Sequence, residues 1–350
     1  MNDTYLIYFA LSFLVSFVSI PIIIYLSKAL NIYDHTDERK IHVGKISRLG
    51  GVGIFFGFIL PFVIIVIPQY QLNFNIYLYL VAIFISFIIG FLDDLKSICA
   101  KYKFLLQIIT GIIVAFSGLN IDKVMITNEF VIEFGMFSYI ITAFWVVMFM
   151  NAINLIDGMD GLASGVVFIA NVFIFLIAIS NNNLFVALTV LLLAGSILGF
   201  YCFNFPPAKI FMGDGGAYFL GFMYATLPLM SIQQSSGATL FIIPLILLLV
   251  PITDIFQVIL RRMKKGYNIF LADNSHLHHR LLNMGLTTRE ILILIYTYTF
   301  LLGVSSLLML YIQPKYMFLV FLSIIILISV SFYLLNFIEK IKDNDGKKII

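Results

Sequence analysis

Charged residues and cysteines are scarce in this chain. Only 11% of its 350 residues are charged, the formal net charge is +3, and 61% are hydrophobic with a mean hydropathy of +1.06. Soluble globular proteins carry roughly 25% charged residues, so this composition excludes that class and indicates an integral membrane protein. The two cysteines, Cys99 and Cys202, form no CxxC pair and no Cys–His spacing. Neither a disulfide framework nor a zinc site is therefore indicated.

Several other signals are missing as well. No basic residue precedes the first apolar run and no small-x-small cleavage site follows it, so we expect an anchored first span rather than a cleaved signal. No internal repeat, low-complexity segment or linker divides the chain. We therefore expect residues 1–350 to form a single membrane domain with no nucleic-acid partner.

Long apolar runs dominate the sequence instead. Crossing a hydrocarbon core of about 30 Å takes about 20 residues in a helix. The sequence therefore predicts an all-α polytopic protein with 11 transmembrane helices: Tyr5–Leu30, Val52–Ile67, Tyr77–Leu92, Phe104–Leu119, Phe137–Ile156, Leu162–Ser180, Leu184–Phe203, Ala217–Ile232, Leu240–Leu260, Ile291–Ile312 and Tyr316–Ile338.

Lysine and arginine placement predicts the topology. With the N-terminus outside and the C-terminus inside, every Lys and Arg except Lys123 and Lys315 falls on the cytoplasmic side. The longest of these cytoplasmic loops is the ninth. The outer segment Asn120–Met136 alternates apolar and polar residues around Asn128, which predicts a short β-hairpin on the outer face.

The stretch NAINLIDGMDGLASG places polar side chains in this apolar background. If its first part stays helical, Asn154, Asp157 and Asp160 follow at i, i+3 and i+6 and share roughly one face. Buried carboxylates are costly unless they bind a cation, a polar ligand or each other. Gly161-x-x-x-Gly165 is also a helix-packing motif, and packing explains these glycines but not the acids.

Other polar clusters fall on the same predicted face. They are Asp93-Asp94 with Lys96, Lys101 and Lys103; KIFMGDGG with Lys209 and Asp214; HLHHR, from His276 to Arg280; and RKIHVGKISRLGGVG, with Arg39, Lys40, His42, Lys45 and Arg48. Carboxylates that converge at one membrane face suit Mg²⁺, which prefers a few carboxylates together with phosphates and waters. The histidines lie beside basic residues and favour contact with phosphate or sugar oxygens over zinc. The pattern therefore predicts a site for a phosphorylated or diphosphate substrate.

Simpler interpretations exist for single motifs. Asp93-Asp94 also fits a solvated helix end paired with Lys96, Asp214 an ordinary Asp-Gly turn, and Lys264 with Lys265 a topology anchor. A secondary transporter is the alternative function, because intramembrane acids also mark ion pathways. That alternative predicts sites near the midplane and an internal repeat, and the sequence has no repeat.

Together these motifs resemble one family. FLDDLKSICAKYKFLLQ, NAINLIDGMDGLASG, PAKIFMGDGGAYFLG and SHLHHRLL are similar, in order, to the polyprenyl-phosphate N-acetylhexosamine-1-phosphate transferases of the MraY/WecA/TagO superfamily. The HxHHRLL form resembles the WecA/TagO branch. The resemblance implies transfer of an N-acetylhexosamine-1-phosphate, with GlcNAc the first choice, from a UDP-sugar to undecaprenyl phosphate with release of UMP. It also implies Mg²⁺ (with Mn²⁺ as a substitute), a homodimer, and a location in the bacterial cytoplasmic membrane with the site facing the cytoplasm.

The resemblance assigns roles to individual residues. It implies Asp214 as the main Mg²⁺ ligand, Asp93 and Asp94 beside the metal and the lipid phosphate, and Asn154 with Asp157 on the diphosphate–metal assembly. Asp160 would face the nucleotide, and Lys101 or Lys103 the lipid phosphate. The remaining residues would contact diphosphate and sugar: His276, His278, His279 and Arg280. We expect single in-line displacement; a two-step route through an aspartyl intermediate stays open.

Overall fold

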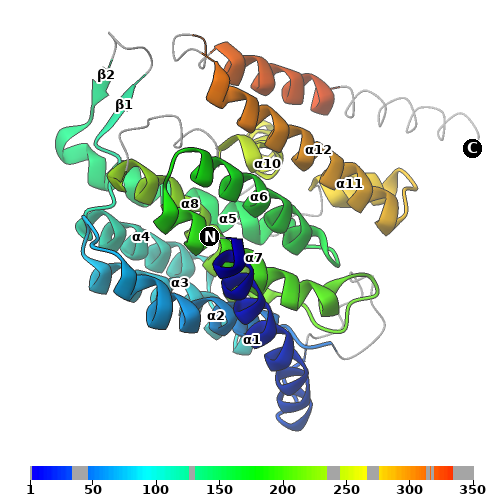
Figure 1. Cartoon of the computed structure of the whole chain (residues 1–350). Helices are drawn as coiled ribbons and strands as arrows, with labels where there is room; N and C mark the ends of the chain where they lie inside the picture. Colours follow the sequence, from blue (N-terminus) through cyan, green and yellow to red (C-terminus); the bar gives the residue numbers. More distant parts are fainter. Residues whose placement is uncertain are drawn as a thin grey trace, which may run out of the picture.

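The computed structural model describes residues 2–33, 46–125, 131–234, 245–265, 276–312, 316 and 319–333. This part of the chain is helical apart from one hairpin (Figure 1). The helices are α1 (Asn2–Ala29), α2 (Gly50–Pro61), α3 (Ile76–Leu95), α4 (Ala100–Phe116), α5 (Ser138–Ile156), α6 (Leu162–Ser180), α7 (Leu184–Asn204), α8 (Gly213–Gln234), α10 (Leu249–Lys265), α11 (Leu277–Asn283) and α12 (Thr288–Leu308). The short helices are η1 (Phe62–Val66), η2 (Ile67–Gln69), η3 (Gly135–Phe137) and η4 (Met309–Tyr311), and the strands are β1 (Lys123–Met125) and β2 (Val131–Glu133).

Polar side chains fix several helix starts. Asn75 accepts hydrogen bonds from the N–H groups of Tyr77 and Leu78 at the start of α3, and Asn183 caps α7 in the same way. Thr287 and Glu290 form a reciprocal capping box at the start of α12. These side chains replace the hydrogen-bond partners that the first turn of a helix lacks.

Seven helical segments of the described chain are long and apolar enough to cross a membrane: Thr4–Ala29, Gly50–Gln69, Ile76–Leu95, Gly135–Ile156, Leu162–Ser180, Leu184–Asn204 and Thr288–Tyr311. They correspond to seven of the predicted spans. The other four predicted spans coincide with α4 and α10, of 17 residues each, with the longer but less apolar α8, and with the shorter helix Leu319–Tyr333. The all-α polytopic architecture is confirmed, whereas the count of 11 spans stays a prediction.

Helix α8 is the centre of the bundle. Every residue from Gly215 to Ser231 is buried, and α2, α3 and α5 pack against this helix. Helix α1 packs along α7, and α6 lies between α7 and α12, so that α1 and α12 occupy opposite flanks in Figure 1. A helix that is hydrophobic on all sides is typical of a protein core or of a membrane span. The first turn of α8 is thus held by several neighbouring helices.

The outside of the bundle is apolar. Leu6 and Ile64 are 69% and 70% exposed, and many other large hydrophobic side chains on the outer helices are also exposed. Apolar surface of this extent is costly in water and is normal where a protein faces lipid tails. The exposure pattern agrees with a multi-pass membrane protein.

The predicted hairpin is confirmed. β1 pairs antiparallel with β2, with Val124 opposite Ile132. The hairpin joins the end of α4 to the start of α5 and lies at the end of the bundle opposite α11 (Figure 1). Its tip, with Asn128, lies outside the described residues, as do Arg39, Lys40, His42 and Lys45 of the first predicted loop and the lysines of the C-terminal tail.

Candidate functional site

Three of the predicted site residues meet around one lysine. Lys103, in the first turn of α4, donates through Nζ to Asp93 Oδ2 at 3.0 Å and to Asp214 Oδ2 at 3.2 Å. Asn154, near the end of α5, donates to the other oxygen of Asp214 at 3.0 Å. Burial acts to lower the pKa of Lys103, but the charges of Asp214 and Asp93 outweigh it and raise that pKa above its ordinary value. Lys103 is therefore a permanent cation between two carboxylates.

The structure also distinguishes Lys101 from Lys103, the two candidates for contact with the lipid phosphate. Lys103 is half-buried against the carboxylates, whereas Lys101 is exposed on the same helix turn. Lys209, which precedes the GDGG turn, is exposed too. Lys103 is thus the lysine that the fold brings to Asp93 and Asp214.

Asp94 has a different environment from its neighbour Asp93. Its Oδ1 accepts the backbone N–H of Asp214 at 2.8 Å, and its Oδ2 accepts that of Gly215 at 2.9 Å. The last turn of α3 therefore caps the first turn of α8. The resemblance implied a place beside the metal, but both oxygens of Asp94 bind backbone, so its visible task is to position Asp214.

Asp157 belongs to the same cluster. Burial, together with the charges of Asp214 and Asp94, raises the pKa of Asp157 well above its ordinary value, while Arg48 and a hydrogen bond from the Gly213 backbone oppose this rise. Arg48 precedes α2, and the backbone on either side of it pairs with the segment before α8: Phe211 N–H donates to Ser47 O, and Gly50 N–H to Phe211 O. Sequence reasoning placed Arg48 only among the basic residues of its loop.

Asp160 leaves the cluster. The expected common face of Asn154, Asp157 and Asp160 is wrong at its last member, because α5 ends at Ile156 and Gly161 takes a positive φ of 74°. Asp160 is buried and accepts the backbone N–H of Ala208 at 2.9 Å. In this structure it therefore fixes the segment after α7, and the helical spacing that predicted its orientation does not continue past Asp157.

The predicted histidines reach the same region through Gly158. A Cβ atom at Gly158 would lie 2.4 Å from His278 Nε2, so the imidazole ring packs directly on the glycine backbone. Burial, aided by His279 and His276, lowers the pKa of His278 to about 3, while Asp254 opposes this shift. His279 is half-buried, and its pKa is lowered mainly by burial. His278 is therefore a neutral side chain whose buried Nε2 has no hydrogen-bond partner among the described residues.

Asp254 and Arg280 complete the histidine region. His276 Nδ1 lies 3.1 Å from Asp254 Oδ2, and both side chains are buried. Arg280, on α11, is buried, as are His276 and His278. Asp254 was missed from the sequence, although it is the single acid in the run LLLVPITDIFQVIL, where a buried charge needs a partner.

The two remaining glycines of the stretch NAINLIDGMDGLASG have a packing role. A Cβ at Gly165 would clash with the hydroxyl group and the ring of Tyr296 from α12, and Tyr296 Oη donates to the carbonyl of Gly161. This contact agrees with the small-xxx-small interpretation for Gly161 and Gly165. The motif thus combines a packing surface with the site residues that precede it.

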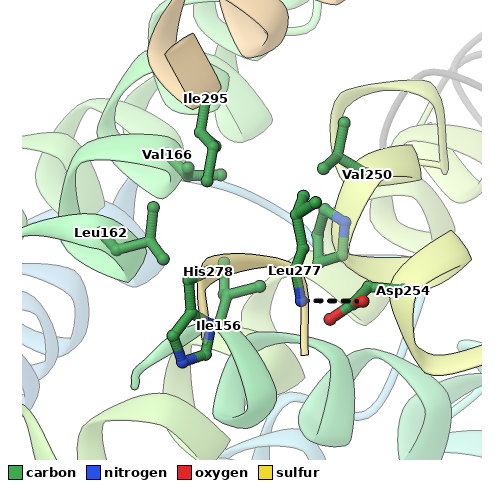
Figure 2. A pocket seen from close by; sticks show the side chains of 9 residues that line it. Ile156, Leu162, Val166, Val250, Asp254, Leu277, His278 and Ile295 are labelled. Carbon is green, nitrogen blue, oxygen red and sulfur yellow. Dashed lines mark hydrogen bonds between the residues drawn. The ribbon is translucent and has the colours of Figure 1, made fainter. Parts of the chain in front are cut away.

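An apolar pocket lies beside the histidine helix (Figure 2). Figure 2 shows His278 and Leu277 on one side, Val250 and Asp254 from α10 on another, and Leu162, Val166 and Ile295 around the rest. Ile156, the last residue of α5, also lines it. The pocket therefore adjoins the polar cluster at the point where α5 ends.

The carboxylates of Asp93 and Asp214 and the amide of Asn154 are groups that can bind Mg²⁺. Among the described residues, no three His, Cys, Asp or Glu side chains are arranged as a metal site. Asp93 and Asp214 nevertheless share one cation already, the ammonium of Lys103, and Asn154 adds an amide next to Asp214. Two carboxylates and an amide fit Mg²⁺, which takes its other ligands from phosphates and water. Binding would require Lys103 to move aside.

Comparison with known proteins identifies the family. The profile of glycosyl transferase family 4 matches residues 76–232, from α3 to α8. A protein of Bacillus subtilis named "Probable undecaprenyl-phosphate N-acetylglucosaminyl 1-phosphate transferase" is 35% identical over 313 residues, which cover 87% of this chain and 86% of the relative. The chain belongs to glycosyl transferase family 4.

Other members of glycosyl transferase family 4 align over most of the chain. The "Undecaprenyl-phosphate alpha-N-acetylglucosaminyl 1-phosphate transferase" of Escherichia coli (strain K12) is 28% identical over 277 residues, covering 77% of this chain and 74% of the relative. The "Decaprenyl-phosphate N-acetylglucosaminephosphotransferase" of Mycobacterium leprae is 30% identical over 318 residues, covering 83% and 80%. The resemblance noted in the motifs is confirmed, and this family 4 member is an enzyme of the transferase type.

Proposed function

We propose that this protein transfers GlcNAc-1-phosphate from UDP-GlcNAc to undecaprenyl phosphate and releases UMP. The observation that carries the proposal is the alignment, over 87% of the chain, with the Bacillus subtilis relative named for this reaction on undecaprenyl phosphate. The cluster of carboxylates, Lys103 and histidines at one end of the helices supports it, because a diphosphate donor needs cations and hydrogen-bond donors around its phosphates.

The proposed cofactor is Mg²⁺, which Mn²⁺ could replace. Asp214, Asp93 and Asn154 would hold it, and Asp94 would act through the backbone of α8 by keeping Asp214 in place. When bound, the ion would neutralise charge on the transferred phosphate. Lys103 could then turn toward the phosphate of the lipid acceptor, because the metal ion would replace its ammonium as the counterion of Asp93 and Asp214.

The proposed reaction is a single in-line displacement. A lipid phosphate monoester has a second pKa near 6 and is largely a dianion at pH 7, so its oxygen can attack the sugar-bound phosphorus without a strong base. Asp93 would therefore serve by position rather than by proton removal. The neutral imidazole of His278 can donate one hydrogen bond to a phosphate or sugar oxygen without adding charge.

The proposed setting is the bacterial cytoplasmic membrane, with the site facing the cytoplasm and the hairpin on the outer side. The helix directions support this arrangement: α3 and α5 end at the site, whereas α4 and α8 begin there. A single domain and a homodimer complete the proposal. Crosslinking in intact membranes tests the dimer, and cysteine labelling from either side tests the topology.

The decisive experiment uses purified protein, undecaprenyl phosphate and Mg²⁺ with a panel of UDP-sugars and measures UMP release. We expect release with UDP-GlcNAc and its loss in Asp214→Asn and Asp93→Asn. Asp122→Asn is the control, because Asp122 is an exposed acid near the hairpin. Near-full activity in either site variant would refute the proposed site.

The same preparation separates the two reaction routes. Without lipid acceptor, labelled UMP should not enter UDP-GlcNAc if displacement is a single step. Exchange in the absence of lipid would instead favour the aspartyl intermediate.

A further inference from the structure

Asp254 is a buried acid on α10. Its side chain is 4% exposed on α10, between apolar neighbours that include Val250 and Pro251. A carboxylate in such a place is costly unless hydrogen-bond donors satisfy it. Asp254 thus requires partners, and the structure provides two of them from one short helix.

Both partners belong to the start of α11. Asp254 Oδ2 lies 3.1 Å from His276 Nδ1, and Asp254 Oδ1 accepts the backbone N–H of Leu277 at 3.1 Å. Figure 2 shows the second of these bonds as the dashed line between Leu277 and Asp254. His276 occupies the position before α11 but makes no side-chain cap there. The acid from α10 therefore replaces the missing local cap.

The bond to His276 also selects one form of its ring. An ionised carboxylate only accepts hydrogen bonds, so the proton on His276 must lie on Nδ1. Nε2 is then the ring nitrogen that stays available to another group. Carboxylates fix histidine tautomers in the same way behind many metal-bound histidines.

The ring of His278 has nearly the same orientation as that of His276. The rings of His276 and His278 are parallel within 5°, with centroids 6.2 Å apart, and the ring of His278 rests on Gly158 at the end of α5. Helix α11 is consequently held at two points, by Asp254 from α10 and by the glycine surface after α5.

We propose that Asp254 is a positioning residue for the donor site: it anchors α11 and fixes the Nδ1–H tautomer of His276, so that Nε2 faces the diphosphate or sugar of the nucleotide donor. The identity of the ligand rests on the proposed function, whereas the anchoring of α11 and the tautomer of His276 rest on the contacts of Asp254. Asp254 touches neither substrate in this scheme and acts through His276.

The first test is spectroscopic and needs no substrate. Protein labelled with ¹⁵N-histidine in nanodiscs should give a His276 signal with a protonated Nδ1 and an unprotonated Nε2, assigned by its loss in His276→Gln. In Asp254→Leu, which removes both acceptor oxygens, this signal should change to the other tautomer or to a mixture. An unchanged His276 tautomer in Asp254→Leu would overturn the proposal.

The second test separates the two substrates. We expect Asp254→Leu to raise KM for UDP-GlcNAc by about tenfold, the loss that one well-made hydrogen bond accounts for, and to change KM for undecaprenyl phosphate by less than about twofold. Asp254→Asn keeps one acceptor oxygen and should recover part of the loss. Equal increases in both KM values, or no recovery in the asparagine variant, would contradict a positioning role.

Thr253→Val is the matched control. Thr253 is adjacent on α10, and within the described part of the chain its hydroxyl donates to carbonyls of its own helix, those of Leu249 and Val250. The control should keep the wild-type tautomer and both KM values, and a control that behaves like Asp254→Leu would overturn the proposal. If the wild-type protein released no UMP from UDP-GlcNAc, the proposed function would fail, whereas the tautomer measurement would still decide the role of Asp254.

Discussion

Replacing Asp94 by asparagine should destabilise the protein more than the same change at Asp93. Asp94 binds the N–H groups of Asp214 and Gly215 with its two oxygens, at 2.8 and 2.9 Å. Asparagine has one oxygen, so one of these N–H groups would face an amide NH₂ instead. The adjacent Asp93 contacts one backbone N–H, that of Ile98, and the ammonium of Lys103.

The expected difference follows from these contacts. Loss of a helix cap costs about 1 kcal/mol, and leaving a partly buried N–H group without an acceptor costs about 1–3 kcal/mol. Asp94→Asn should therefore lower the free energy of unfolding by about 1–3 kcal/mol. Asp93→Asn should cost less than about 1 kcal/mol, because asparagine can still accept from Ile98, Lys103 keeps Asp214, and the repulsion between two carboxylates disappears.

Both variants can be measured in mixed micelles by SDS titration with fluorescence detection, with UMP release recorded in parallel. Asp93→Asn should be nearly as stable as the wild type and inactive, whereas Asp94→Asn should lose both stability and activity. An Asp94→Asn protein as stable as the wild type would refute the cap. So would an Asp93→Asn protein that is destabilised to the same extent.

Three further predictions concern Lys103, Gly158 and His278. Lys103→Met should reduce UMP release at least about tenfold more than Lys101→Met, because Lys103 contacts the carboxylates and Lys101 is exposed; equal losses would contradict this assignment. Gly158→Ala should impair transfer because its Cβ would lie 2.4 Å from His278 Nε2, and it should have no further effect on a His278→Ala background, where an additive loss would point to another cause. Because the pKa of His278 is lowered to about 3 in the folded protein, the unfolded chain binds a proton at this histidine at a higher pH than the folded chain does. The free energy of unfolding should therefore fall as the pH drops below about 6.5, by up to about 1.4 kcal/mol per pH unit. Denaturation at pH 5 and 7 should show a smaller difference for His278→Gln than for the wild type, and an unchanged difference would exclude His278 as the source.

The sequence predicted the fold class and several of the polar residues that the structure brings together. Burying a carboxylate in an apolar chain costs free energy, so acids within apolar runs indicate a functional site even before the structure is known. Asp93, Asp214 and Asn154 come from distant segments, and the structure places them around Lys103. The hairpin likewise followed from residue alternation, and the structure adds its register, with Val124 opposite Ile132.

Other features depended on tertiary contacts that spacing does not encode. Asp94 and Asp93 are identical and adjacent, yet one caps α8 and the other contacts Lys103. Asp160 departs from the helical face because α5 ends at Ile156. Asp254 was overlooked because its partner, His276, is 22 residues away and on another helix. Such assignments need the relative placement of helices, which hydrophobic periodicity alone does not give.

The ammonium of Lys103 gives the resting site an internal counterion. Two acids that would repel each other at the end of a membrane helix bundle are kept together by a charge that the chain itself carries. The protein can thus be assembled and inserted before any substrate arrives, without a vacant anionic cavity. Under the proposed function, an arriving phosphate would compete with the carboxylates for Lys103, so that binding of the acceptor and release of the acids for a metal ion would be coupled.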